Sequence, residues 1–269
     1  MVISPDNPQG INISTDERRD ATGIVATNLL RQAINMRKAN ANCPDDDLTM
    51  CAALDTVNGK NVVPQCSRSD LLNADVSKLG SEGALPGFIP MYIGMPVILC
   101  KKNISTELGI SNGSQGFLRS FSTATCPSGF TYCTGAIVEF SGSKAALQKL
   151  PPKFFPLEPI KWTFTSNIKS LNDNNKEHIV KARIQHTQMP FEPGFASTGH
   201  SAQGKTLQKV LAWLHEGGFA AYMAASHPKT RYDLAVIQSV TLSDLNKLLP
   251  YDLIQETKCH EVLEHNTLV

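Results

Sequence analysis

The sequence predicts an α/β fold in which a larger domain of alternating strands and helices is interrupted by a module of short strands. Near the N-terminus, an apolar strand leads directly into an amphipathic helix. The middle of the chain instead carries short apolar runs separated by Gly, Pro, Ser and Asn clusters, and the last third returns to alternating strands and helices. A chain of 269 residues with 41% hydrophobic content can bury the core that such a fold needs.

The first predicted region covers residues 1–92. Residues 1–20 are polar, residues 23–26 form a buried strand, and Asn28 can cap the helix that follows. From residue 39 to residue 87 the sequence is rich in Ser, Asn and Asp, which predicts an irregular surface connection.

The second predicted region, residues 93–188, reads as an inserted β module. The short apolar runs here lie at residues 96–100, 117–119, 136–140, 162–164 and 179–184. Short strands between turn-forming clusters are typical of a small β-barrel.

The third predicted region, residues 189–269, completes the α/β domain. We expect strands at 207–214 and 234–240 and a helix at 218–226. In that helix the spacing of Phe219, Tyr222 and Met223 favours core packing. Ser243 is a candidate N-cap for a final helix.

Composition limits the classes of protein that remain. The formal net charge is +1, so a nucleic-acid site would have to be local. The seven cysteines form no C-x-x-C pair, and their odd number favours reduced intracellular thiols over a secreted disulfide framework. No apolar run approaches the roughly 20 residues that span a bilayer, and no signal-peptide core is present, so we expect an intracellular protein without a membrane partner.

Residues 199–206 fit the P-loop pattern G-x-x-x-x-G-K-[ST], in which backbone N–H groups and a lysine hold phosphates. A P-loop follows a buried strand and opens a helix. Here Pro190 and Pro193 precede the stretch, and residues 210–214 read as a strand. A small P-loop ATPase or kinase using Lys205 is therefore the weakest of three hypotheses.

A second interpretation assigns the same stretch to nucleic-acid contact. Thr198, His200 and Ser201 offer hydroxyl and imidazole donors to phosphate oxygens, and Gly204 lets a backbone approach closely. Residues 195–207 are similar to motif V of superfamily 1B helicases, with its Thr-x-His-x-x-Gln-Gly-x-Thr core.

Three further segments match the same family in the expected order. Residues 24–35, including Asn28 and Asn35, resemble motif IV; residues 94–103 with 112–116 look like the family's strand and N-G-x-x-G turn; and residues 218–226 are similar to the motif VI helix. The chain thus resembles the C-terminal half of a superfamily 1B DNA helicase of the petite-integration-frequency, RecD-like type. That resemblance implies an incomplete RecA-like parallel-sheet domain interrupted by an SH3-like barrel, and 5′ to 3′ polarity.

The resemblance also implies roles for residues. Thr198, His200 and Ser201 would contact single-stranded DNA, and Gln203, Gly204 and Lys205 would face the nucleotide. A tight turn explains Gln203 and Gly204 as well as ligand contact does.

Two departures from the family pattern bear on catalysis. The sequence before residue 24 is too short for the first RecA-like domain that carries the P-loop. His227 stands where the family places an arginine finger, and an imidazole is largely neutral near pH 7 and lacks the guanidinium fork. Lys229 or Arg231 is a less favoured substitute, because both are offset along the chain.

We therefore expect ATP and Mg²⁺ to act only in a complete helicase, with a first RecA-like domain and single-stranded DNA as partners. We expect no metal held by protein ligands, because His260 and His265 are five apart rather than four. The leading hypothesis is a helicase motor half, in the nucleus or the mitochondrion. The alternative from another class is a non-catalytic remnant or adaptor that binds single-stranded nucleic acid.

Overall fold

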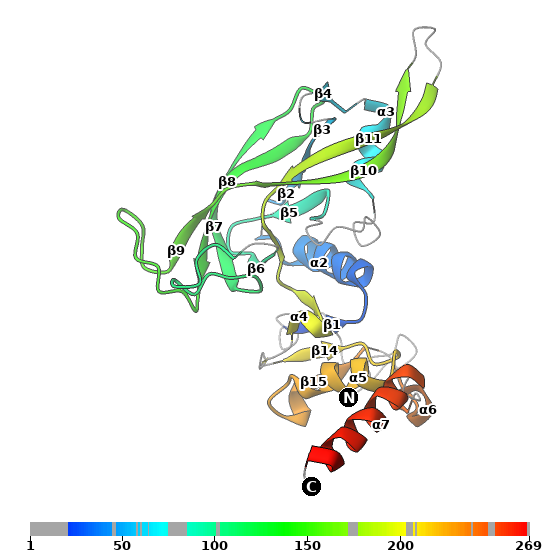
Figure 1. Ribbon diagram of the computed structural model, residues 1–269. Coiled ribbons are helices and arrows are strands. Elements are labelled where there is room, and N and C mark those ends of the chain that lie inside the picture. The colour runs from blue at the N-terminus through cyan, green and yellow to red at the C-terminus, as the bar shows by residue number, and fades with distance from the viewer. Residues whose placement is uncertain are drawn as a thin grey trace. The chain divides into compact units, whose positions relative to one another are not determined.

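The structure is a computed structural model that describes the chain from residue 21 to residue 267, apart from residues 45–46, 58, 60, 64, 75–84, 101–102, 172–176, 203–206, 208, 238 and 247–250 (Figure 1). The chain divides into two compact units. One comprises Met1–Thr27 and Ser197–Val269, and the other comprises Asn28–Ala196.

A four-stranded sheet forms the centre of the first unit. Its strand order is β13 (Ala196–Thr198), β1 (Thr22–Val25), β14 (Val210–Ala212) and β15 (Leu234–Val236). β1 and β15 both run parallel to β14. Val210 and Ala212 are fully buried, as expected for a parallel strand covered on both faces. The predicted mixed α/β fold is confirmed, although β14 and β15 are shorter than the predicted strands.

The helices of this unit are α4 (Gly199–Ala202), α5 (Gly218–Ser226), the 3₁₀ turn η3 (Arg231–Asp233), α6 (Leu242–Leu245) and α7 (Tyr251–Thr267). Helix α5 has the predicted bounds and lies against β14 (Figure 1). Before it, Gly217 has a φ of 62°, a conformation that favours glycine. The prediction of Ser243 as an N-cap is wrong: Thr241 caps α6, and its side chain accepts the Asp244 N–H at 3.2 Å.

The second unit begins with helix α2 (Asn28–Asn42) and contains an antiparallel sheet of five strands. Their order is β12 (Phe191–Pro193), β6 (Pro96–Leu99), β7 (Gln115–Thr125), β8 (Thr131–Phe140) and β9 (Phe154–Leu157). Val97, Leu118, Val138 and Phe191 pack in the core of this unit. The predicted runs at 96–100, 117–119 and 136–140 thus belong to observed strands.

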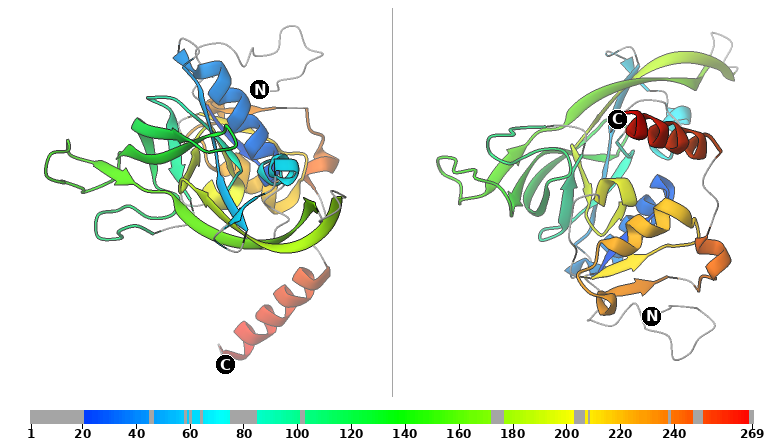
Figure 2. Two further views of the ribbon diagram at one scale, coloured as in Figure 1. Left: turned by 90° about the horizontal axis from the view of Figure 1, so that it is seen from above. Right: turned by 60° about the horizontal axis from the view of Figure 1, so that its bottom comes forward.

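A second sheet of the same unit has the order β10 (Ile160–Leu171), β11 (Glu177–Gln188), β3 (Leu54–Val57) and β4 (Asn61–Val62). Both views in Figure 2 show β10 and β11 as one long, curved hairpin. The remaining elements are β2 (Thr49–Ala52), β5 (Phe88–Met91), which pair with each other, and α3 (Gln65–Leu72).

The prediction of an irregular connection over residues 39–87 is wrong where β2, β3, β4 and α3 form. Strand β3 gains its hydrogen bonds from β11, where Asp55 lies opposite His186, 131 residues later. Pairing over such a distance leaves no local periodicity for sequence analysis to detect.

A buried polar pair lies in the core beneath the second sheet. Asp55 Oδ1 lies 2.5 Å from His186 Nδ1, and the two side chains are 0% and 2% exposed. The Trp162 ring is centred 5.0 Å from the imidazole ring. The Phe164 ring is centred 6.2 Å from the same imidazole ring, so two aromatic side chains lie beside the pair.

Burial controls the chemistry of two core thiols. It raises the pKa of the Cys51 thiol to about 12 and that of Cys133 to about 11. Both therefore stay neutral and pack as small apolar side chains.

Among the described helices, none combines the length and apolar character needed to cross a membrane.

Candidate functional site

A shallow hollow lies at the carboxyl ends of two neighbouring parallel strands in the first unit. Ala26 follows β1 and Trp213 follows β14, and both line it together with Gly199 at the start of α4 and Phe219 and Met223 of α5. Ligands of open α/β sheets bind beyond the carboxyl ends of the strands. The cavity volume is about 80 Å³, well below the roughly 300–1,000 Å³ of pockets that enclose small-molecule ligands. The described residues therefore offer a contact surface and do not enclose a nucleotide.

The stretch with the P-loop pattern begins beside this hollow. Thr198 ends β13, which lies at the edge of the sheet, and Gly199, His200 and Ser201 form most of the four-residue helix α4. The predicted nucleotide-facing residues Gln203, Gly204 and Lys205 lie outside the described residues. Beyond them, Leu207 bridges to Pro228 and β14 begins at Val210. The chain thus continues into a strand, whereas a P-loop opens a helix.

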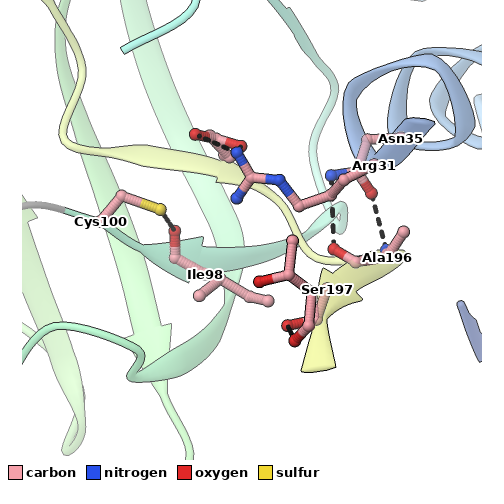
Figure 3. A network of polar contacts seen from close by, with 8 residues as sticks. Arg31, Asn35, Ile98, Cys100, Ala196 and Ser197 are labelled. Carbon is pink, nitrogen blue, oxygen red and sulfur yellow. Dashed lines mark hydrogen bonds and ion pairs between the residues drawn. The ribbon is translucent and has the colours of Figure 1, made fainter. Parts of the chain in front are cut away.

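In the second unit, a side chain of the predicted motif IV holds the backbone just before Thr198. The Asn35 Oδ1 atom accepts the Ala196 N–H at 2.7 Å, and its Nδ2 atom donates to the Ala196 carbonyl at 3.5 Å (Figure 3). Asn35 is 3% exposed. One turn earlier, Arg31 donates to Oε1 of the buried Glu192 at 3.1 Å, and the two side chains form an ion pair with Nη2 and Oε2 2.8 Å apart. Two successive turns of helix α2 are thereby fixed by polar contacts, one to β12 and the other to the first residue of β13.

We expect Asn35→Ala to lower the free energy of unfolding by about 1–3 kcal/mol, because two buried backbone groups of Ala196 lose their side-chain partner. Chemical denaturation followed by circular dichroism measures this change. Asn73→Ala is the matched control, since the exposed Asn73 also donates to a backbone carbonyl, that of Ser69 at 2.9 Å. Equal losses in the two variants would contradict the role given to Asn35.

The two predicted catalytic residues lie in different environments after α5. His227 is 5% exposed, and its carbonyl accepts the Leu207 N–H at 3.0 Å. Arg231 is exposed, stacks 4.8 Å from the centre of the Tyr232 ring, and donates to the Tyr232 hydroxyl at 2.7 Å. The imidazole is thus enclosed by protein, while the guanidinium lies at the surface.

The prediction that Phe219 and Tyr222 pack in the core is wrong. These side chains are 61% and 68% exposed, and Ala221 and Ala224 of the same helix face the core instead. Small alanines let α5 pack closely on the sheet, which leaves the larger rings outside. Sequence analysis missed this aromatic face, because helical spacing shows which residues share a face but not whether that face is covered.

A metal ion would need a group of His, Cys, Asp or Glu side chains among the described residues. Within that part of the chain, no three His, Cys, Asp or Glu side chains are grouped so as to hold a metal ion. His260, one of the two histidines considered from sequence, lies 3.6 Å from Glu256 on the same exposed helix.

No model of a protein family matches this chain, and no curated protein matches it. The similarities are to solved structures of helicases. The Pif1 helicase from Candida albicans matches with a TM-score of 0.56 and 17% identity, over 95% of this chain and 50% of the helicase. The Pif1 helicase from Bacteroides matches with the same TM-score of 0.56 in its complex with ADP-AlF3 and single-stranded DNA, at 15% identity over 93% of this chain and 47% of the helicase.

A third structure, Bacteroides Pif1 bound to single-stranded DNA, matches at 16% identity with a TM-score of 0.56, over 94% of this chain and 48% of the helicase. The chain therefore has a helicase-related fold and spans about half the length of the Pif1 helicases that it matches. At these identities the similarity establishes the fold.

Proposed function

We propose that this chain is the C-terminal motor half of an ATP-dependent 5′ to 3′ DNA helicase. In this proposal the first unit is part of the second RecA-like domain, and the β strands of residues 93–188 form its inserted SH3-like module. The observation that carries the proposal is the predicted motif V stretch, which begins at a strand end beside the carboxyl edge of a parallel sheet. The similarity to half of a Pif1 helicase fold supports it.

Single-stranded DNA is the proposed partner of the stretch around Thr198. The Thr198 and Ser201 hydroxyls and the His200 imidazole would donate to phosphate oxygens, which makes binding salt-dependent and poor in sequence preference. The Asn35 contacts to Ala196 would position this stretch.

A first RecA-like domain is the second proposed partner, and it would hold ATP and Mg²⁺. The exposed Phe219 and Tyr222 support this assignment, because clustered apolar side chains on a surface mark interaction sites. Gln203, Gly204 and Lys205 would face the nucleotide from this chain.

The buried position of His227 favours a second candidate function, a non-catalytic adaptor that binds single-stranded DNA. An enclosed imidazole does not replace an arginine that must reach a γ-phosphate. In this candidate the same Thr198 stretch binds DNA, and pairing with a P-loop domain restores no hydrolysis. Lys229 and Arg231, both exposed, are the other cations proposed for the catalytic role.

Thr198→Val tests the proposed DNA contact. We expect the affinity for a fluorescent single-stranded oligonucleotide to fall about tenfold, because a hydrogen bond to a charged phosphate contributes about 1.5 kcal/mol or more. Fluorescence anisotropy at low salt measures the change. Thr125→Val, at an exposed position of β7, is the control and should bind as the wild type does. Unchanged affinity in Thr198→Val would remove this residue from the site.

A further inference from the structure

The β10–β11 hairpin has two chemically different faces. Over residues 161–169 and 181–188, more buried residues alternate with more exposed ones, whereas His178, Ile179 and Val180 near the hairpin end are all exposed. The inner face carries Trp162, Phe164 and Ile184, which pack in a hydrophobic core. The outer face, which we call the ribbon face, is made of Lys161, Thr163, Thr165, Asn167 and Lys169 on β10 and Ile179, Lys181, Arg183, Gln185 and Thr187 on β11.

The ribbon face is basic although the chain as a whole is nearly neutral. Lys161, Lys169, Lys181 and Arg183 are all exposed on it, and none of its ten residues is acidic. Glu177, opposite Leu171 at the hairpin end, lies just beyond it. Four like charges gathered on one face give this surface a local positive potential that the net charge of +1 conceals.

The four charges form a row of defined length. Arg183 is opposite Thr165 and Lys181 is opposite Asn167, so both lie between Lys161 and Lys169. At about 3.3 Å per residue, the row is roughly 26 Å long, with successive charges roughly 13, 7 and 7 Å apart. Each strand of duplex DNA carries one phosphate per about 3.4 Å of helix axis, so a row of this length can contact several phosphates.

The row is also held rigidly. The Ser67 hydroxyl of α3 accepts the Lys169 N–H at 2.6 Å and donates to the Lys169 carbonyl at 3.1 Å. The Arg183 guanidinium donates to Thr163 Oγ1 at 3.3 Å, which directs it along the row. Binding of a ligand would therefore immobilise few further groups of the protein, which keeps the entropy cost of binding low.

The composition of the ribbon face distinguishes between nucleic-acid ligands. Single-stranded nucleic acid binds where a basic groove is combined with aromatic side chains on which bases stack. The ribbon face has no aromatic residue, since Trp162 and Phe164 point into the core. Its Thr, Asn and Gln side chains can instead donate to phosphates beside the charges. We propose that the ribbon face binds the phosphate backbone of double-stranded DNA.

This site is separate from the proposed contact around Thr198, which lies in the other unit. It would let the chain hold duplex DNA whether or not the chain is part of a motor.

The test compares the salt dependence of binding for two variants with equal charge loss. The ribbon variant carries Lys161→Gln, Lys169→Gln, Lys181→Gln and Arg183→Gln. The control variant carries Lys144→Gln, Lys149→Gln, Lys153→Gln and Lys258→Gln, at exposed positions that do not belong to the ribbon face. A fluorescent 20-base-pair duplex and a single strand of the same length are titrated from low to high salt.

For the duplex, we expect the slope of log K against log salt to become shallower by about 3–4 in the ribbon variant, since each lost phosphate contact removes about 0.9. The control variant should change the slope by less than about 1. A third variant, with the three ribbon lysines replaced by arginine, should retain the wild-type slope and shows that charge is the cause.

Equal changes in the ribbon and control variants would overturn the proposal, because net charge alone would then explain binding. A change for the single strand as large as that for the duplex would overturn the assignment to double-stranded DNA. Thr198→Val should weaken single-strand binding without altering the duplex slope, so failure of the proposed motor function and failure of this site give different results.

Discussion

Replacing Asp55 with alanine is expected to lower the free energy of unfolding by about 3–5 kcal/mol. The substitution leaves His186 with 2% of its side chain exposed and without the carboxylate 2.5 Å away. A buried polar group that loses its partner retains its full desolvation cost. Urea denaturation followed by tryptophan fluorescence measures the loss, because the Trp162 ring lies beside the imidazole.

A double replacement separates loss of the pair from loss of packing. Asp55→Leu combined with His186→Phe removes both polar groups and keeps apolar volume beside Trp162 and Phe164. We expect this variant to be clearly more stable than Asp55→Ala, because replacing both partners of a buried hydrogen-bonded pair by apolar groups is often nearly neutral. If the double variant is as unstable as the single one, the pair is not the cause of the loss.

The sequence predicts elements best where their stabilising contacts are local. The β1 strand, helix α2 and helix α5 were all predicted, since each has its own hydrophobic pattern and is bounded by turn or capping residues. Strand β3 was missed because Asp55 pairs with a residue 131 positions away. The contact of Asn35 with Ala196, 161 positions away, could not be predicted either, although Asn35 belongs to the segment that resembles motif IV.

For the candidate site, the sequence indicated the stretch around Thr198 but not its surroundings. The exposure of Phe219 and Tyr222 depends on what covers helix α5. Ala221 and Ala224 face the core instead, but alanines in a sequence indicate only weakly which face of a helix is buried. The basic ribbon face depends on the register of β10 and β11, which alternation alone does not define.

The second large effect concerns ATP. We expect the isolated chain to show no ATP hydrolysis above background, with or without single-stranded DNA. Hydrolysis needs a loop that cradles the β- and γ-phosphates and holds Mg²⁺. The described residues around the sheet edge form a hollow of about 80 Å³, and the chain after the P-loop pattern enters a strand at Val210.

Addition of a separately produced first RecA-like domain from a Pif1 helicase distinguishes the two leading candidates. Hydrolysis that appears only in the mixture and rises with single-stranded DNA supports a motor half. Its absence, with DNA binding retained, supports the adaptor and agrees with the enclosed His227.

We propose above all that the stretch beginning at Thr198 contacts a nucleic-acid strand and that residues 199–206 do not wrap a triphosphate as a P-loop does. This proposal is tested most directly by measuring ATP turnover and single-strand binding for the wild-type chain and for Lys205→Ala. We expect no turnover in either protein and DNA binding that weakens as salt rises. Turnover by the wild-type chain that disappears in Lys205→Ala would contradict this expectation and establish the P-loop alternative.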